Sequence, residues 1–239
     1  MSQNLSDEML ARKYYYLGRL YEMGMMWFEF DMNESVRYID MAARLNYPAA
    51  IFQKGMTYFH GRGDRGQDYN LAFKYFFLSG TEDGRYMVAK CYENGYGVDM
   101  NMTKAIKIYE SLSMNGYSYA AMTLGSIYLS GRTGVEKDTP RALDYFLHAG
   151  ELGNSAGYEA LAKCYFFGLG GLEVDKDMAD KWLKEWAKID DTPEDPYFYD
   201  ELEPKEYDEA MKFFKELAEL GDEDAIFVIK AKKNFKPKW

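Results

Sequence analysis

The residue types that most often carry catalysis or metal binding are few in this sequence, and they lie far apart. His60 and His148 are the only histidines, and neither has a cysteine or carboxylate at the spacing of metal ligands. Cys91 and Cys164 are the only cysteines, and no serine or cysteine stands in a nucleophile motif. We therefore expect no metal site, no catalytic residue and no enzymatic activity.

One glycine-rich stretch has the spacing of a dinucleotide-binding loop. Residues 61–66 read Gly-Arg-Gly-Asp-Arg-Gly, which matches G-x-G-x-x-G. That fingerprint binds pyrophosphate only when a strand precedes it and a helix N-terminus follows it. Here a helical pattern precedes the glycines, so we interpret the stretch as a turn between helices and expect no cofactor.

The composition excludes several classes of partner. The 239 residues carry a net charge of −10, which would repel a phosphate backbone, so we expect no nucleic acid. No apolar run approaches the roughly 18 residues of a membrane span, so we expect no membrane partner. Residues 1–10 are polar and include Asp7 and Glu8, which is unlike a secretory leader. We expect a cytoplasmic protein.

The clearest pattern is a tyrosine that recurs every 34 to 37 residues. A small residue always stands three positions before it, and a glycine always stands three positions after it. A small residue in the middle of a helix indicates close approach of a neighbouring helix, and the glycine indicates a helix end. The five tyrosines are Tyr21, Tyr58, Tyr92, Tyr128 and Tyr165; the small residues are Gly18, Gly55, Ala89, Gly125 and Ala162; the glycines are Gly24, Gly61, Gly95, Gly131 and Gly168.

A second helix follows each glycine. Each begins at a residue type that caps helices, and an apolar stripe follows at helical spacing. A hairpin of two such helices can bury its stripes only against neighbouring hairpins, so the sequence predicts an α-solenoid. The five caps are Asp31, Asp68, Asn101, Asp138 and Asp175.

The best copy of the first helix is Ala120–Tyr128, of the form A-x-x-x-L-G-x-x-Y, and Gly95, Gly97 and Val98 give the loop form G-x-G-V. With the D-x-x-x-A start of the second helix, this pattern resembles the Sel-one-like repeat family, relatives of the tetratricopeptide repeats. The resemblance implies an all-α fold, a right-handed α-solenoid of about five to six helix-turn-helix repeats with a concave groove. It also implies a non-catalytic scaffold or adaptor that binds other proteins.

We expect one domain over residues 1–239. The repeats cover approximately 10–46, 47–81, 82–116, 117–153 and 154–189. An acidic insertion containing prolines follows at 190–205, and a degenerate last repeat with a capping helix follows at 206–239. Residues 190–209 hold ten carboxylates against one lysine. The acidic segment favours an alternative function, that of an inhibitor or immunity protein that neutralises a basic enzyme or toxin. An enzyme with an unrecognised site is the remote alternative.

The candidate binding surface is one face of the first helices. Positions nine, six and two before each repeat tyrosine, and one after it, return to the same side of the helix. In tetratricopeptide-like solenoids this side lines the concave surface, so the resemblance implies that it holds a peptide or helix of a partner protein. The predicted groove residues are Tyr15, Arg19, Phe52, Met56, Phe59, Tyr86, Lys90, Tyr119, Met122 and Lys163.

Two other interpretations remain open for these residues. The aromatic side chains either fill a tightly wound superhelix or meet a second copy of the chain. The sequence leaves the oligomeric state open, and a monomer is one of the possibilities. Trp27 and Phe30 have no counterpart in the later repeats. They either seal the amino-terminal end of the solenoid or form an exposed contact patch.

Overall fold

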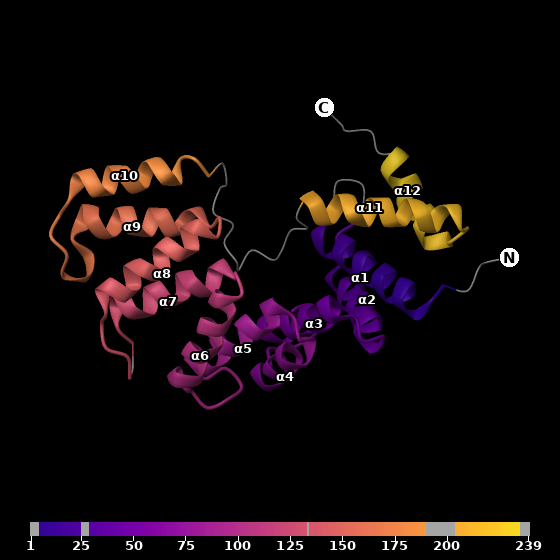
Figure 1. Ribbon diagram of the computed structural model, residues 1–239. Coiled ribbons are helices and arrows are strands. Elements are labelled where there is room, and N and C mark those ends of the chain that lie inside the picture. The colour runs from indigo at the N-terminus through magenta and orange to yellow at the C-terminus, as the bar shows by residue number, and fades with distance from the viewer. Residues whose placement is uncertain (1–4, 25–28, 133, 190–203, 235–239) are drawn as a thin grey trace. The chain divides into compact units, whose positions relative to one another are not determined.

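The computed structural model describes residues 5–24, 29–132, 134–189 and 204–234. The described residues form twelve α-helices and one short 3₁₀ helix, and they contain no strand (Figure 1). This confirms the predicted all-α class. In the same part of the chain, no helix is both long enough and apolar enough to cross a membrane.

Ten of these helices alternate as first and second helices of five hairpins. The first helices are α1 (Asp7–Met23), α3 (Pro48–His60), α5 (Glu82–Asn94), α7 (Ser118–Ser130) and α9 (Ser155–Phe167). The second helices are α2 (Met32–Arg44), α4 (Tyr69–Ser79), α6 (Met102–Met114), α8 (Thr139–Glu151) and α10 (Lys176–Trp186). The 3₁₀ helix η1 (Leu169–Gly171) lies in the loop after α9, and α11 (Pro204–Glu219) and α12 (Glu223–Asn234) complete the described chain.

The loops are held by the two residues that define each repeat. The side chain of each predicted cap accepts a hydrogen bond from a backbone N–H of its helix, as Asp68 does from Leu71 at 2.9 Å. The backbone N–H of the same residue donates to the carbonyl of the repeat tyrosine, as from Asp68 to Tyr58 at 2.9 Å. The equivalent bonds join Asp31 to Tyr21, Asn101 to Tyr92, Asp138 to Tyr128 and Asp175 to Tyr165. The cap and tyrosine therefore fix both ends of each loop.

The small residues in mid-helix allow the two helices of a hairpin to touch. A Cβ atom at Gly125 would lie 2.5 Å from the Phe146 ring, and one at Gly55 would lie 2.6 Å from the Phe76 ring. Real Cβ atoms do not approach other atoms so closely, so the neighbouring aromatic ring occupies the space that a side chain would need. The predicted close helix contact is confirmed.

The chain forms two compact units. The first unit contains Met1–Gly84 and Phe198–Trp239, and the second contains Arg85–Tyr197. The chain thus passes from the first unit to the second within α5. Each unit is described by itself below.

The C-terminal helices of the first unit pack against its N-terminal repeat (Figure 1). Phe213 and Phe214 of α11 lie in one hydrophobic cluster with Tyr16 of α1, and the Tyr16 and Phe213 rings are 5.9 Å apart. The Lys13 ammonium pairs with Asp222 at 2.7 Å. The sequence predicted a degenerate last repeat with a capping helix at 206–239. It did not indicate the helix that α11 covers.

Candidate functional site

In the first unit, most of the predicted groove residues are buried. Tyr15, Arg19, Phe52 and Met56 have little surface for a partner to contact, and Phe59 is half-buried. The Phe52 ring packs 5.7 Å from that of Phe76. These side chains belong to the internal packing of the unit, which is the alternative that the sequence left open.

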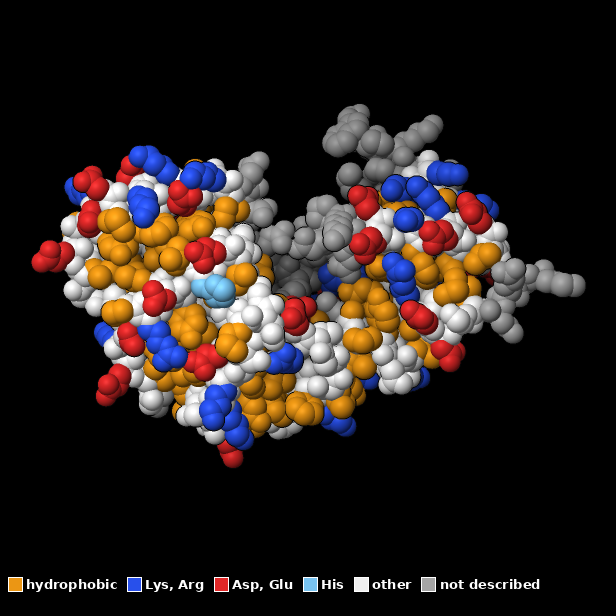
Figure 2. Space-filling view, viewed as in Figure 1, with side chains coloured by type: hydrophobic (Ala, Val, Ile, Leu, Met, Phe, Trp, Pro, Cys, Tyr) orange, Lys and Arg blue, Asp and Glu red, His pale blue; other side chains and the backbone are white. Residues whose placement is uncertain are grey.

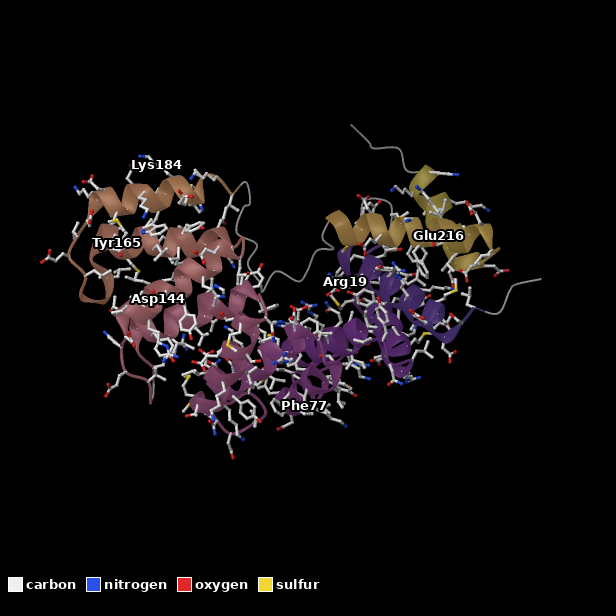
Figure 3. All side chains as sticks on the ribbon, in the orientation of Figure 1. Arg19, Phe77, Asp144, Tyr165, Lys184 and Glu216 are labelled. Carbon is white, nitrogen blue, oxygen red and sulfur yellow. The ribbon has the colours of Figure 1, made fainter. Side chains whose placement is uncertain are left out.

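Arg19 can be buried because its charge is paired within a cluster of two arginines and one glutamate. Its guanidinium donates to the carboxylate of Glu22 at 2.5 Å, one turn further along α1. Arg62, which follows the glycine that ends α3, donates to the other oxygen of Glu22. Figure 3 labels Arg19 on α1. Because a buried carboxylate needs partners, this pairing ties the first repeat to the second.

In the second unit, Tyr86 is buried and packs against two other tyrosines. Its ring lies 5.5 Å from the rings of Tyr109 and Tyr117, and its hydroxyl is 2.9 Å from the Thr123 hydroxyl. Lys90 is half-buried, with its ammonium 5.8 Å from the centre of the Tyr86 ring. Tyr86 therefore positions accessible residues and offers little surface of its own.

The accessible part of the predicted face lies on three first helices of the second unit. Tyr119 and Met122 on α7 are half-buried, whereas Ser126 on α7 and Lys163 on α9 are exposed. The Lys163 ammonium pairs with Glu159 at 2.6 Å. We call this surface the first-helix face, and it comprises Lys90, Tyr119, Met122, Ser126 and Lys163.

Phe30, one residue of the predicted contact patch, is exposed. A Cβ atom added at Gly24 would lie 2.4 Å from the Cβ of Phe30, so a side chain at Gly24 would overlap Phe30. Trp27 lies outside the described residues, as do residues 190–203 of the acidic insertion. The contact patch and the acidic insertion therefore stay predictions.

Sequence reasoning missed a second buried carboxylate at the same position of the repeat. Glu93, which directly follows its repeat tyrosine as Glu22 does, is buried. It accepts a hydrogen bond from the Tyr109 hydroxyl at 2.8 Å and pairs with Arg132 at 2.7 Å. Both arginines directly follow the glycine that ends the next first helix. The sequence signal for this pairing was a glutamate directly after a repeat tyrosine, matched about one repeat later by an arginine directly after the glycine that ends the helix.

The repeat tyrosines form a further pattern that spacing alone could not show. Tyr128 stacks on Tyr145 of the second helix, with ring centres 5.8 Å apart and planes 7° apart, and the Arg141 guanidinium lies 4.2 Å from the Tyr128 ring centre. Tyr58 and Tyr75 stack in the same way at 5.6 Å. In these two hairpins a guanidinium lies over the aromatic pair, that of Arg141 in one and that of Arg65 in the other, and these contacts stabilise the hairpin.

A cavity of about 880 Å³ lies in the second unit, along the loops that follow α7 and α9. Its lining includes Ile106, Tyr128, Lys137, Leu143 and Leu172. Glu136, Asp138 and Thr139 also line it. The cavity contains no histidine or cysteine, and we assign it no chemistry.

The two cysteines are buried, and His148 contacts a backbone carbonyl. Burial raises the pKa of the Cys91 thiol to about 12, and it also raises the pKa of Cys164, so neither thiol is activated. Within the described residues, no three histidine, cysteine or acidic side chains come together as a metal site would require. The His148 ring lies 3.2 Å from the Ser113 carbonyl oxygen, as expected for a structural histidine.

Comparison with known proteins agrees with this architecture. The family model described as Sel1 repeat matches residues 11–47, 48–80, 82–117, 118–154, 155–191 and 197–222. A Sel1 repeat protein from Oxalobacter formigenes has a similar solved structure, with a TM-score of 0.57 and 28% identity over 73% of this chain and 50% of that one. The immunity protein Pa5087 from Pseudomonas aeruginosa shares the fold, with a TM-score of 0.53 and 18% identity over 75% of this chain and 69% of that one.

A curated relative is the chitin synthase regulator SKT5 of Saccharomyces cerevisiae, 27% identical over 164 residues. The match covers 64% of this chain but 24% of the yeast protein, so this chain spans about a quarter of that relative. Sel1 repeat proteins generally mediate contacts between proteins and are typically non-catalytic scaffolds. The six matched repeats show that the chain belongs to the Sel1 repeat family.

Proposed function

We propose that the chain is a non-catalytic adaptor that binds a segment of another protein across the first-helix face. The observation that carries this proposal is the accessibility of Tyr119 and Met122 on α7, with Lys90 on the preceding first helix and Lys163 on the following one. Aromatic and methionine side chains are enriched at protein interfaces, and charged residues at the edge fix the orientation of a partner.

Hydrogen bonds between the helices beneath the first-helix face hold it as a rigid surface. The Tyr86 hydroxyl joins α5 to Thr123 on α7, and the Asn154 amide at the start of α9 donates to the Ser118 hydroxyl of α7 at 3.4 Å. These contacts link the three helices before a partner arrives. A preorganised surface loses less conformational entropy on binding than a mobile one.

The charges indicate the chemistry of the partner segment. Lys163 is more than half exposed, and an exposed ion pair such as Lys163–Glu159 contributes about 0–1 kcal/mol, so it exchanges readily for a partner carboxylate. A segment with one large apolar side chain and acidic neighbours fits this face. A relative named as a regulator of an enzyme is compatible with such a binding role.

The test is partner capture by the full chain, followed by affinity measurement with the partner that mass spectrometry identifies. Met122→Ala and Tyr119→Ala should each weaken binding by about 1 kcal/mol, roughly fivefold. The matched control is Phe77→Ala, which truncates an exposed aromatic on α4 of the other unit (Figure 3). Equal losses for Phe77→Ala and Met122→Ala would contradict the proposed site.

The inhibitor function stays an alternative prediction. The acidic insertion suggested this alternative, and most of that insertion lies outside the described residues. The likeness to an immunity protein, at 18% identity, shows the fold alone.

A further inference from the structure

Lys13 of α1 departs from the repeat at a position where the other first helices carry a small residue. In α5, a Cβ at Gly84 would lie 2.6 Å from the Phe76 carbonyl oxygen of the preceding second helix. The same contact recurs between α9 and α8, where a Cβ at Gly157 would lie 2.4 Å from the Phe146 carbonyl oxygen. A lysine side chain does not fit into so close a contact. The four equivalents of Lys13 are Ala50, Gly84, Ala120 and Gly157.

The Lys13 side chain instead binds the start of α12. Its ammonium lies 2.7 Å from the carboxylates of both Asp222 and Asp224, and the side chain is only 8% exposed. Asp222 also caps α12, because its carboxylate accepts a hydrogen bond from the Ala225 N–H at 3.0 Å. A single cation therefore keeps two neighbouring carboxylates together at the contact with α1, and without it they would repel each other.

Aromatic side chains complete the contact between α11 and α1. The Phe213 ring lies 5.9 Å from the Tyr16 ring, and the Arg12 guanidinium lies 4.7 Å from the centre of the Phe213 ring. Phe214 is fully buried, with its ring 6.4 Å from that of Tyr16. Figure 2 shows acidic and basic side chains interspersed over the region of α11 and α12, which agrees with an apolar stripe that is turned inward. Long side chains thus span this contact, whereas a small residue brings the backbones together in the later repeats.

Helices α11 and α12 are also held to each other, independently of α1. The Asp222 N–H donates to the Leu217 carbonyl at 3.1 Å, which fixes the turn between the two helices. The Lys232 ammonium of α12 lies 4.8 Å from the centre of the Tyr207 ring of α11. Because these contacts do not involve α1, the two helices can move together. We call α11 and α12 the strap.

We infer that the strap is a releasable closure of the first repeat, which opens from α1 as one body and is held shut by Lys13. Local opening costs least where contact density is low, and the contact at Lys13 lacks the close backbone approach of the later repeats. The open form uncovers Tyr16 and the side of α1 on which a preceding repeat would pack. The closed strap therefore denies that side of α1 to other proteins. This inference goes beyond the proposed adaptor function, which rests on residues of the second unit.

The test is hydrogen exchange of the full chain, followed by mass spectrometry of peptides from each helix. In the wild-type chain, the backbone amides of the strap should exchange faster than those of α3, which lies in the same unit. Lys13→Ala should raise the exchange rate of the strap at least about tenfold, because the two aspartates lose their shared cation. The exchange rate of α3 should stay unchanged, since the strap opens without unfolding the repeats.

Lys54→Ala is the matched control. The Lys54 side chain is 15% exposed, and its ammonium pairs with Asp40 of α2 at 3.1 Å, so the variant removes a similarly buried lysine from a pair that does not include the strap. The exchange rate of the strap should not change. An equal rise in Lys54→Ala and Lys13→Ala would overturn the inference, as would equal exchange rates of the strap and α3 in the wild-type chain.

A charge exchange tests the role of Lys13 directly. Lys13→Asp should speed exchange of the strap further, because three carboxylates then meet at the contact. Adding Asp224→Lys should restore slow exchange, since one ammonium again lies between two carboxylates. A double variant that exchanges as fast as Lys13→Asp alone would contradict the role of Lys13, and a Lys13→Ala variant in which α3 speeds up as much as the strap would show that the strap does not open by itself.

Discussion

Two buried glutamates show how single residues join neighbouring repeats. Glu22 and Glu93 stand at the same repeat position, and each binds an arginine from the next repeat. The phenol of Tyr109 adds a hydrogen bond to Glu93, and burial, together with the nearby Glu93 carboxylate, raises the pKa of Tyr109 well above its ordinary value. Tyr109 therefore stays a neutral donor to the carboxylate.

A comparison of two arginine variants tests the buried pairing. Arg132 and Arg141 are equally exposed, at 44%, but Arg132 binds a carboxylate that is 3% exposed and Arg141 binds one that is 33% exposed. Arg132→Met should lower the free energy of unfolding by about 1–3 kcal/mol, because Glu93 loses its cation. Arg141→Met should cost less than about 1 kcal/mol. Urea denaturation measures both, and equal losses would contradict the role of Glu93.

The cysteines give a prediction on pH. Burial raises the pKa of Cys91 from 9.0 to about 12, so the folded state favours the neutral thiol. Its stabilising contribution is complete below pH 9 and is lost as the pH rises through about 12. At pH 8, iodoacetamide should therefore label Cys91 only after denaturation. Rapid labelling of the folded chain, followed by peptide mass spectrometry, would show that the thiol is accessible.

At the scale of the helix, the sequence predicted most of what the structure contains. The tyrosine, the glycine and the cap could be read because each fixes the backbone of its own loop, as the Asp68 to Tyr58 bond shows. The packing of α11 on α1 could not be read, because an apolar stripe does not specify which helix covers it. Lys13 was the single sequence signal, since it stands where the other repeats have glycine or alanine.

The close helix contact gives a prediction on stability. Gly125→Leu should lower the free energy of unfolding by about 1–3 kcal/mol, because the new side chain would overlap the Phe146 ring. Gly66→Leu is the matched control, since nothing lies within 4 Å of a Cβ at that position. Thermal melts followed by circular dichroism measure both. If the Gly125 variant melts with the wild-type midpoint, the packing described for α7 and α8 is wrong.

At the scale of the whole molecule, the repeat register predicted a face but could not predict its exposure. Phe52 and Met122 both belong to this face, yet Phe52 is buried and Met122 is partly accessible. The difference depends on what surrounds each hairpin, and the spacing of residues within one repeat does not contain that information. The candidate site is therefore smaller than the sequence predicted and is confined to the second unit.

The most direct test of the adaptor proposal is photo-cross-linking of the full chain in its own cells. A benzophenone amino acid placed at Met122 or Ser126 should yield a covalent adduct with the same partner protein, because both positions lie on the accessible first-helix face. The same probe at Phe77, which is exposed on α4, should not capture that partner. No adduct from positions 122 and 126, or an equally abundant one from position 77, would contradict the proposal.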